Sequence, residues 1–276
     1  MEAVAANGAD MPVLGFGTWQ LRGDACSSLV KQAIETGYTH IDTAIMYENE
    51  EEVGEGIRAS GKARDRLFIT TKVWPDQLSD GAFQENVEAS LKRLDLSYVD
   101  LVLIHWPPKG RKDTADWMRL LNDVAQRGYT HHIGVSNFTT RMIEESVAAS
   151  QRSLACNQVE NHPYLDQRKV RAMCDRHGLA LVAYCPLYRD GGLFSEPAIA
   201  NAASTHGKSP AQIVLRWHIQ SGGVAIPKTA KPSRLSENID IFDFALSGAE
   251  MAAINALRAR NSRLCDFEFS PDWDDV

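Results

Sequence analysis

Residues 67–105, LFITTKVWPDQLSDGAFQENVEASLKRLDLSYVDLVLIH, contain one complete strand–helix–strand unit. Apolar and β-branched residues fill its two ends, 67–72 and 99–105, and a helix-length amphipathic segment, 81–94, lies between them. This pattern predicts two neighbouring parallel strands, because a parallel pair needs a long crossover that is usually a helix. The unit therefore indicates an α/β fold.

The same alternation continues through most of the chain on both sides of this unit. It predicts eight strands, at 14–17, 39–42, 67–72, 99–105, 131–136, 155–160, 179–184 and 224–227. Helical segments are predicted between them at 27–35, 50–59, 81–94, 114–127, 139–149, 166–177 and 209–220. Such a chain fits a closed (β/α)8 TIM barrel or an open doubly wound sheet. We favour the barrel because eight strands are the number that closes it.

Two further features complete the predicted architecture. Asn7-Gly8 is typical of a type I′ turn, so an N-terminal β-hairpin is expected to cap the bottom of the barrel. No Pro/Gly/Ser-rich linker or block of charge divides the sequence. Residues 1–276 are therefore expected to form a single barrel domain, since this length is common for the fold.

The formal net charge is −7 at pH 7 and the pI is near 5.6. This balance leaves no overall basic surface, so neither nucleic acid nor a membrane is expected as a partner. Five widely spaced cysteines without a Cys-x-x-Cys pair indicate reduced thiols. The first eight residues lack the basic and apolar regions of a secretory signal, and we expect a cytoplasmic protein.

Polar and charged residues stand at the C-terminal end of nearly every predicted strand. In a (β/α)8 barrel these ends, with the loops that follow them, form the active site. The residues concerned are Asp42, Lys72, His105, Ser136, Asn137, the stretch Gln158 to His162, Tyr184 and Lys228. A barrel with a purely structural role does not need such groups, so the pattern indicates an enzyme.

Asp42, Tyr47, Lys72 and His105 form a candidate acid–base set. Each one alone has an ordinary explanation as a helix cap, a packed aromatic, a surface charge or a core histidine. Together, the Lys72 ammonium would lower the pKa of the Tyr47 phenol, and Asp42 would hold that ammonium in place. A neutral His105 would orient a carbonyl oxygen, which would take the Tyr47 proton. The set suits carbonyl reduction, in which hydride reaches carbon while a proton reaches oxygen.

Nine short stretches carry a more specific signal. They are 11–19 (MPVLGFGTW), 41–44 (IDTA, with Tyr47 after it), 71–74 (TKVW), 105–107 (HWP), 134–138 (GVSNF), 157–160 (NQVE), 183–187 (AYCPL), 226–229 (IPKT) and 237–238 (EN). In order and spacing they resemble the aldo-keto reductase family, most closely its short bacterial members of the 2,5-diketo-D-gluconate reductase type. The resemblance implies a monomeric enzyme that reduces small aldehydes, ketones or α-dicarbonyls to alcohols, with hydride from NADPH and a proton from Tyr47. It also implies a catalytic tetrad of Asp42, Tyr47, Lys72 and His105.

The resemblance further implies where the cofactor binds. Ser136, Asn137 and Gln158 would hold the nicotinamide carboxamide, and Tyr184 would stack on the ring. A cluster after the eighth strand would bind the adenosine 2′-phosphate, which favours NADPH over NADH: Lys228, Thr229, Arg234 and Asn238. Leu187 and Glu237 belong to the same motifs and complete the implied cofactor set.

Aromatic residues after the strand ends are expected to line the substrate pocket, namely Trp19, Trp74 and Trp106. Three aromatics near the C-terminus, Phe267, Phe269 and Trp273, are candidates for a lid. Short loops predict an open pocket for small or polar carbonyls. Tyr188 and Arg189 stand where the family usually has a small residue. Arg189 would either contact the cofactor phosphates or be solvated.

Two other signals are set aside. The stretch 54–59, GEGIRA, matches a dinucleotide-binding pattern but lies inside a helical segment instead of directly after a strand. No Cys, His and carboxylate set converges in the sequence, and no metal is expected. The alternative function is an NADPH-binding regulatory or redox-sensing module with little turnover, and the intact tetrad argues against it.

Overall fold

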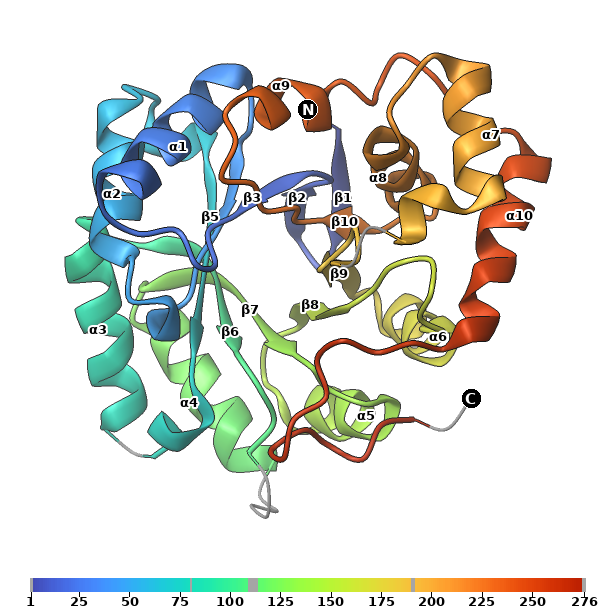
Figure 1. Cartoon of the computed structure of the whole chain (residues 1–276). Coiled ribbons are helices and arrows are strands. Elements are labelled where there is room, and N and C mark those ends of the chain that lie inside the picture. The colour runs from blue at the N-terminus through green and yellow to red at the C-terminus, as the bar shows by residue number, and fades with distance from the viewer. Residues whose placement is uncertain (1, 80, 109–113, 190–191, 275–276) are drawn as a thin grey trace.

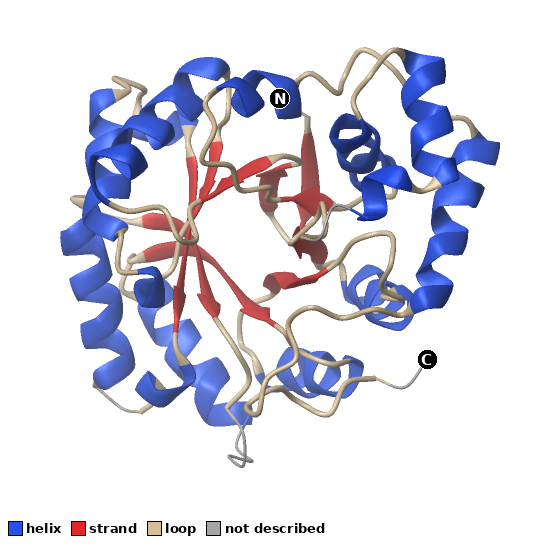
Figure 2. Cartoon of the chain, viewed as in Figure 1, coloured by secondary structure: helices blue, strands red, loops and turns tan. Residues whose placement is uncertain are grey.

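The computed structural model describes residues 2–79, 81–108, 114–189 and 192–274. Within these ranges eight parallel strands form one sheet, and helices surround it (Figures 1 and 2). The strands follow one another in sequence order: β3 Gly15–Gly17, β4 His40–Asp42, β5 Phe68–Val73, β6 Val99–Ile104, β7 Thr130–Ser136, β8 Leu154–Glu160, β9 Ala180–Tyr184 and β10 Val224–Ala225.

The first and last strands of this sheet meet and close it. A parallel bridge joins Leu14 to Ala225. The Ala225 amide donates to the Val13 carbonyl at 2.9 Å, and the Gly17 amide donates to the Pro227 carbonyl at 3.1 Å. The choice of a closed (β/α)8 barrel over an open sheet is therefore confirmed.

Helices surround the barrel, and those that pack directly on the strands turn an apolar stripe toward them. In α3, for example, Phe83, Val87, Leu91 and Leu94 are buried at helical spacing. The α-helices are α1 Gly23–Thr36, α2 Glu50–Ala59, α3 Ala82–Leu94, α4 Thr114–Gln126, α5 Thr140–Ala149, α6 Arg168–His177, α7 Pro197–His206, α8 Pro210–Gln220, α9 Ser233–Ile239 and α10 Gly248–Ala256. Short 3-10 turns are η1 Ile45–Tyr47, η2 Arg64–Arg66, η3 Pro75–Gln77, η4 Gly192–Ser195 and η5 Leu257–Arg260.

The N-terminal hairpin closes the bottom of the barrel. Strands β1 (Ala3–Ala6) and β2 (Ala9–Pro12) pair antiparallel, and the turn residues Asn7 and Gly8 both have positive φ, at 46° and 88°. This geometry fits the expected type I′ turn. Hairpin residues pack into the barrel interior with residues of several strands: Ala6, Ala9, Met11, Phe68, Leu101, Ala155, Ala180 and Val224. The interior is filled at this end, so the open end is the one where the strands finish.

The barrel interior leaves little room near the first strand. A Cβ atom on Gly15 would lie 2.8 Å from Ile226 Cγ2 and 2.9 Å from His40 Nδ1. Glycine at this position therefore permits the close approach of β3 to its neighbours.

Nowhere in the described ranges does a helix combine the length and apolar character needed to cross a membrane.

Candidate active site

Lys72 lies at the centre of the predicted acid–base set. Its Nζ donates to Asp42 Oδ1 at 2.6 Å, to the Thr43 carbonyl at 2.9 Å and to Tyr47 Oη at 3.2 Å. Lys72 belongs to β5, Asp42 ends β4, and Tyr47 ends η1 in the loop that follows. The Lys72 side chain is fully buried, and that of Asp42 is 2% exposed. Two neighbouring strands and the 3-10 turn that follows the first of them thus bring these groups together at the end of the barrel where the strands finish.

Lys72 and Tyr47 both keep their protons in the folded protein, for different reasons. Burial alone would lower the pKa of Lys72, but the Asp42 carboxylate and Tyr47 outweigh this effect and the pKa is raised. Burial raises the pKa of Tyr47, and the Lys72 ammonium opposes this by a smaller amount. The ammonium thus acts in the expected direction, but burial of the hydroxyl outweighs it and the pKa of Tyr47 is raised overall. The phenol therefore holds a proton that it can donate.

His105 directly follows β6 and faces Tyr47. The two rings are 5.7 Å apart between centroids, in an edge-on arrangement. Burial, with a smaller contribution from the Lys72 ammonium, holds the pKa of His105 well below its usual value. The imidazole is therefore neutral at physiological pH and can take part in a hydrogen bond with a carbonyl oxygen.

The residues expected to hold a nicotinamide carboxamide form a connected network beside this set. Asn137, with a positive φ of 64°, donates from Nδ2 to the His105 carbonyl at 3.0 Å. Tyr184 Oη donates to Asn137 Oδ1 at 2.7 Å, and Ser136 Oγ donates to the Gln158 carbonyl at 2.8 Å. Gln158 Nε2 donates to Asp42 Oδ2 at 2.8 Å, a contact that sequence reasoning did not foresee. Hydroxyl and amide groups thus line one side of the tetrad.

Only some side chains of the cluster expected to bind the adenosine 2′-phosphate are exposed to solvent. The side chains of Lys228 and Arg234, the latter in α9, are exposed. Thr229 is buried, and its Oγ1 accepts from the Lys231 amide at 3.0 Å. Glu237 Oε1 accepts from Ser209 Oγ at 2.6 Å. Asn238 is buried in α9, and Leu187 packs against the apolar core after β9. Two exposed cations therefore remain available to an anion.

Aromatic side chains form a wall next to His105. The Trp74 ring lies 5.2 Å from the His105 ring. Phe269 from the C-terminal tail lies 5.4 Å from Trp74 and 5.2 Å from Trp106, and Phe267 lies 5.9 Å from Trp106. Both phenylalanines remain exposed on their other side. They cover the wall as a lid would.

Arg189 contacts residues on both sides of the barrel mouth. Its guanidinium lies 4.6 Å from the centroid of the Trp19 ring, which follows β3. Tyr188, beside it, has a positive φ of 58° and its hydroxyl lies 3.1 Å from Ser262 Oγ. Trp19 is 37% exposed. Arg189 is thus exposed and also packed against an expected pocket residue.

Glu160, at the end of β8, is a positioning residue that sequence reasoning placed at a strand end without giving it a role. Its side chain is fully buried and accepts from the Leu264 and Cys265 amides, each at 2.7 Å, and His162 Nε2 lies 2.8 Å from it. Burial acts to raise the pKa of Glu160, but the His162 contact and these amides lower it overall. The only signal in the sequence was an acidic residue at the end of an apolar strand. This carboxylate fixes the C-terminal tail over the barrel.

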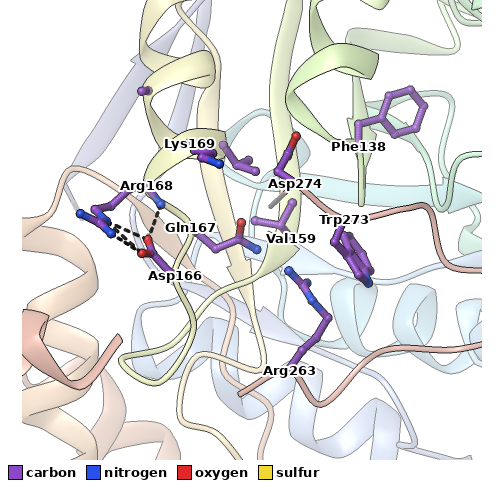
Figure 3. A pocket seen from close by; sticks show the side chains of 11 residues that line it. Phe138, Val159, Asp166, Gln167, Arg168, Lys169, Arg263, Trp273 and Asp274 are labelled. Atoms are coloured by element: carbon purple, nitrogen blue, oxygen red, sulfur yellow. Dashed lines mark hydrogen bonds and ion pairs between the residues drawn. The ribbon is translucent and has the colours of Figure 1, made fainter. Parts of the chain in front are cut away.

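A separate cavity of about 350 Å³ lies between the C-terminal tail and the start of α6 (Figure 3). Its lining includes Gln167, Lys169, Arg263 and Trp273, but none of the tetrad. Trp273, an expected lid residue, lies between the aromatic wall and this cavity: its ring is 6.1 Å from that of Trp106 in the wall, and it also lines the cavity, where the Arg263 guanidinium lies 3.8 Å from its ring centroid (Figure 3). Across the described ranges, no group of three or more His, Cys, Asp or Glu residues is placed to hold a metal ion.

Comparison with known proteins identifies the family. A model of the aldo/keto reductase family matches residues 13–259. Glyoxal reductase of Bacillus subtilis is 45% identical over 91% of this chain and 90% of its own length. Methylglyoxal reductase DkgA of Yersinia pestis is 41% identical over 91% of this chain and 90% of its own. A crystal structure of a candidate 2,5-diketo-D-gluconic acid reductase B superimposes with a TM-score of 0.95 at 42% identity, covering 100% of this chain and 98% of that one.

The chain belongs to the aldo-keto reductase family, as its motifs predicted. It is an oxidoreductase that acts on carbonyl groups with a nicotinamide cofactor. The relatives above are named as reductases, so the alternative of a regulatory module with little turnover has no support.

Proposed function

We propose that this enzyme uses NADPH to reduce small aldehydes, ketones and above all α-dicarbonyls to alcohols. The observation that carries the proposal is the position of Lys72, which hydrogen-bonds both the Asp42 carboxylate and the Tyr47 hydroxyl inside the barrel. In this arrangement Tyr47 is the general acid that protonates the carbonyl oxygen. Lys72 stabilises the phenolate that results, and Asp42 holds Lys72 in place. Neutral His105 orients the carbonyl oxygen toward Tyr47.

The network beside the tetrad fits a nicotinamide. Ser136, Asn137 and Gln158 offer amide and hydroxyl groups for the carboxamide, and the partly buried Tyr184 offers a ring face for stacking. A bound nicotinamide supplies the hydride, and the protein supplies orientation and the proton. Asn137 is itself tied to the backbone of His105, so the cofactor and carbonyl sites share one rigid support.

The preference for NADPH rests on the exposed cations Lys228 and Arg234. An adenosine 2′-phosphate is a dianion, and charge-assisted hydrogen bonds from such groups favour it over the hydroxyl of NADH. Thr229, Asn238, Glu237 and Leu187 would complete this end of the cofactor site. Arg189 stands nearer to Trp19 and is assigned no phosphate.

The substrate class rests on the pocket and on the relatives. Trp19, Trp74 and Trp106 line a mouth that is partly covered by Phe267 and Phe269. Glyoxal and methylglyoxal name the substrates of two relatives, and both are small α-dicarbonyls. We further propose that the chain works as a single-domain monomer in the cytoplasm, without nucleic acid or membrane partners.

The direct test follows the loss of absorbance of the reduced cofactor with NADPH and, separately, with NADH. Glyoxal, methylglyoxal, an aromatic aldehyde and a diketo sugar acid serve as substrates. We expect fast oxidation of NADPH with the dicarbonyls and much slower oxidation of NADH. Equal rates with both cofactors would overturn the NADPH assignment, and the absence of turnover with every carbonyl would overturn the proposed reaction.

Replacing the proposed acid sharpens this test. Tyr47→Phe is expected to lower turnover by about 10²–10⁴-fold, because the phenol no longer supplies a proton. Binding of NADPH, followed by its fluorescence, is expected to stay close to that of the unchanged enzyme. Tyr129→Phe is the matched control, since the Tyr129 hydroxyl lies at the surface, where Glu88 and Arg127 are its partners, and none of the tetrad is among them. Unchanged turnover in Tyr47→Phe would remove Tyr47 from its role.

A further inference from the structure

Two cysteines meet at the edge of the proposed active site although 80 positions of sequence separate them. Cys185 directly follows Tyr184 at the end of β9, and Cys265 lies in the C-terminal tail. Arg189 Nη2 lies 3.2 Å from Cys185 Sγ and 3.9 Å from Cys265 Sγ. One guanidinium therefore contacts both sulfurs, which places the two thiols close together.

The electrostatics of this pair differ from those of the other cysteines. A hydrogen bond from the Cys265 thiol lowers the pKa of Cys185. Burial acts in the opposite direction, but the Arg189 charge adds to the lowering, and the pKa is lowered overall. The same hydrogen bond, with burial, raises the pKa of Cys265. Burial raises the pKa of Cys26 and of Cys174 to about 12. Cys185 is also partly exposed, whereas the other four are buried. Reactivity follows thiolate character and access, so Cys185 is the thiol expected to react.

We propose that Cys185 and Cys265 form a peroxide-sensitive thiol pair, and that their disulfide ties the C-terminal tail to the end of β9 and slows catalysis. The oxidant is a hydroperoxide. The Cys185 thiolate attacks the O–O bond, forming a sulfenic acid while the other oxygen takes a proton and leaves as water or an alcohol. The Cys265 sulfur then attacks the Cys185 sulfur, the S–S bond forms, and the remaining oxygen leaves as water with the thiol proton. Both sulfurs are oxidised and the peroxide is reduced. A dithiol reduces the disulfide back to two thiols by exchange and is itself oxidised to a disulfide.

The position of the pair explains why a disulfide there would affect turnover. Tyr184, the neighbour of Cys185, donates to Asn137 in the network that we assign to the nicotinamide. The tail that carries Cys265 also carries Phe267 and Phe269, which pack on the aromatic wall. A covalent link between these two segments fixes the lid relative to the cofactor site. This effect on turnover depends on the proposed function, whereas the thiol chemistry does not.

The experiment treats the reduced, full-length enzyme with hydrogen peroxide. Free thiols are counted, the intact mass is measured, and the disulfide is located by peptide mapping without reduction. We expect the thiol count to fall from five to three, a Cys185–Cys265 peptide, and slower dicarbonyl reduction that a dithiol restores. If both thiols are consumed but the Cys185–Cys265 peptide is not found, the proposal is wrong. The peptide with unchanged turnover would overturn it as well. The thiol count and the peptide map report disulfide formation even if the enzyme reduces none of the carbonyls tried.

Variants separate this pair from general oxidation. Turnover of Cys185→Ser and of Cys265→Ser, each compared with its own reduced form, is expected to be insensitive to the same peroxide dose. Arg189→Gln is expected to slow disulfide formation, since loss of the guanidinium charge raises the pKa of Cys185 and so lowers its thiolate fraction. Arg168→Gln is the matched control, because Arg168 is an exposed arginine paired with Asp166. An unchanged rate in Arg189→Gln would contradict the assigned role of the guanidinium.

Discussion

At the scale of single residues, the site depends on a buried ion pair. Lys72 and Asp42 have almost no contact with water, and their separation is 2.6 Å. Removing such charges from water is costly, and only a complete set of partners offsets that cost. Asp42 has such a set, since Lys72 and Gln158 each bind one of its oxygens. The buried ion pair is therefore stable because both Lys72 and Asp42 have hydrogen-bond partners for their charged groups. Loss of one charge would leave the other buried without its counter-charge, at the full free-energy cost of its desolvation.

Asp42→Asn tests this argument through stability. The substitution keeps the shape of the side chain but leaves the Lys72 ammonium buried without a counter-charge. We expect the free energy of unfolding, measured in urea, to fall by about 3–5 kcal/mol. Asp95→Asn is the matched control, because Asp95 pairs with Arg58 at the surface and asparagine tolerates its positive φ of 55°. The control is expected to change little, and equal losses in both variants would contradict the argument.

At the scale of elements, two glycines of α2 explain a misleading sequence signal. Gly54 and Gly56 match a dinucleotide-binding pattern, yet both are buried inside the helix. A Cβ on Gly54 would lie 2.3 Å from the Leu94 carbonyl oxygen, and one on Gly56 would lie 2.5 Å from the Ser27 carbonyl oxygen. These positions are glycine because α2 packs closely against the end of α3 and against α1. Setting the pattern aside as a cofactor signal was therefore sound, and its cause is helix packing.

Gly54→Ala is expected to destabilise the protein by about 1–3 kcal/mol, because the new methyl group meets rigid backbone that must move away. The gain in helix propensity opposes only part of this loss. Gly248→Ala is the control, since a Cβ there meets nothing within 4 Å and α10 begins at this residue. Urea unfolding of both variants checks the prediction. A Gly54→Ala protein as stable as the control would mean that α2 can shift without cost.

The helices that sequence reasoning missed show where pattern alone fails. The segment of α10, GAEMAAINA, buries only Ile254 and has no clear apolar stripe. Its start signal was nevertheless present, since Ser247 and Glu250 form a capping box. The segment of α7, PAIANAASTH, is rich in small residues, and its proline at the first position was the corresponding clue.

The site could be predicted only where the strands carry it. Asp42, Lys72 and His105 stand at strand ends, so their convergence follows from the barrel itself. The path of the tail, the Glu160 contacts and the Arg189 contact with Trp19 depend on how distant segments pack, which spacing does not encode. The net pKa of Tyr47 was also beyond reach, because the balance of burial against charge requires coordinates.

At the scale of the whole molecule, an acidic enzyme is proposed to bind a polyanionic cofactor. The net charge of −7 repels NADPH at long range, so attraction must come from the local cations Lys228 and Arg234. Arg234→Gln is expected to raise the KM for NADPH by about tenfold or more, the value of a lost charge-assisted hydrogen bond, and to leave the KM for NADH unchanged. Added salt is expected to weaken NADPH binding more than NADH binding.

Arg141→Gln is the control for that experiment, because Arg141 is an exposed arginine of α5 that pairs with Glu145. Its KM values for both cofactors are expected to match those of the unchanged enzyme. If Arg234→Gln raises both KM values by the same factor, the residue contributes to binding but does not select the 2′-phosphate.

Buried histidines make the stability of the whole fold sensitive to acid. Burial lowers the pKa of His218 from 6.5 to about 3, and it also lowers the pKa of His40 and His105. The unfolded chain, with ordinary histidine pKa values, therefore binds more protons than the folded chain as the pH falls below 6.5. The free energy of unfolding therefore has its full value above pH 6.5 and decreases as the pH falls toward the histidine pKa values of the folded chain. At about pH 5, His218 alone is expected to reduce the free energy of unfolding by about 2 kcal/mol.

Urea unfolding at about pH 7.5 and about pH 5 measures this loss, and His218→Gln assigns it. His218 Nε2 lies 3.0 Å from the Pro186 carbonyl, and a glutamine amide can replace that donor without titrating. The variant is expected to lose about 2 kcal/mol less between the two pH values than the unchanged protein does. His131→Gln, at a histidine that is 53% exposed, is expected to keep the full decrease. A decrease in His218→Gln equal to that of the unchanged protein would place the acid sensitivity elsewhere in the fold. Because the comparison uses a difference between two pH values, any constant loss from the substitution cancels.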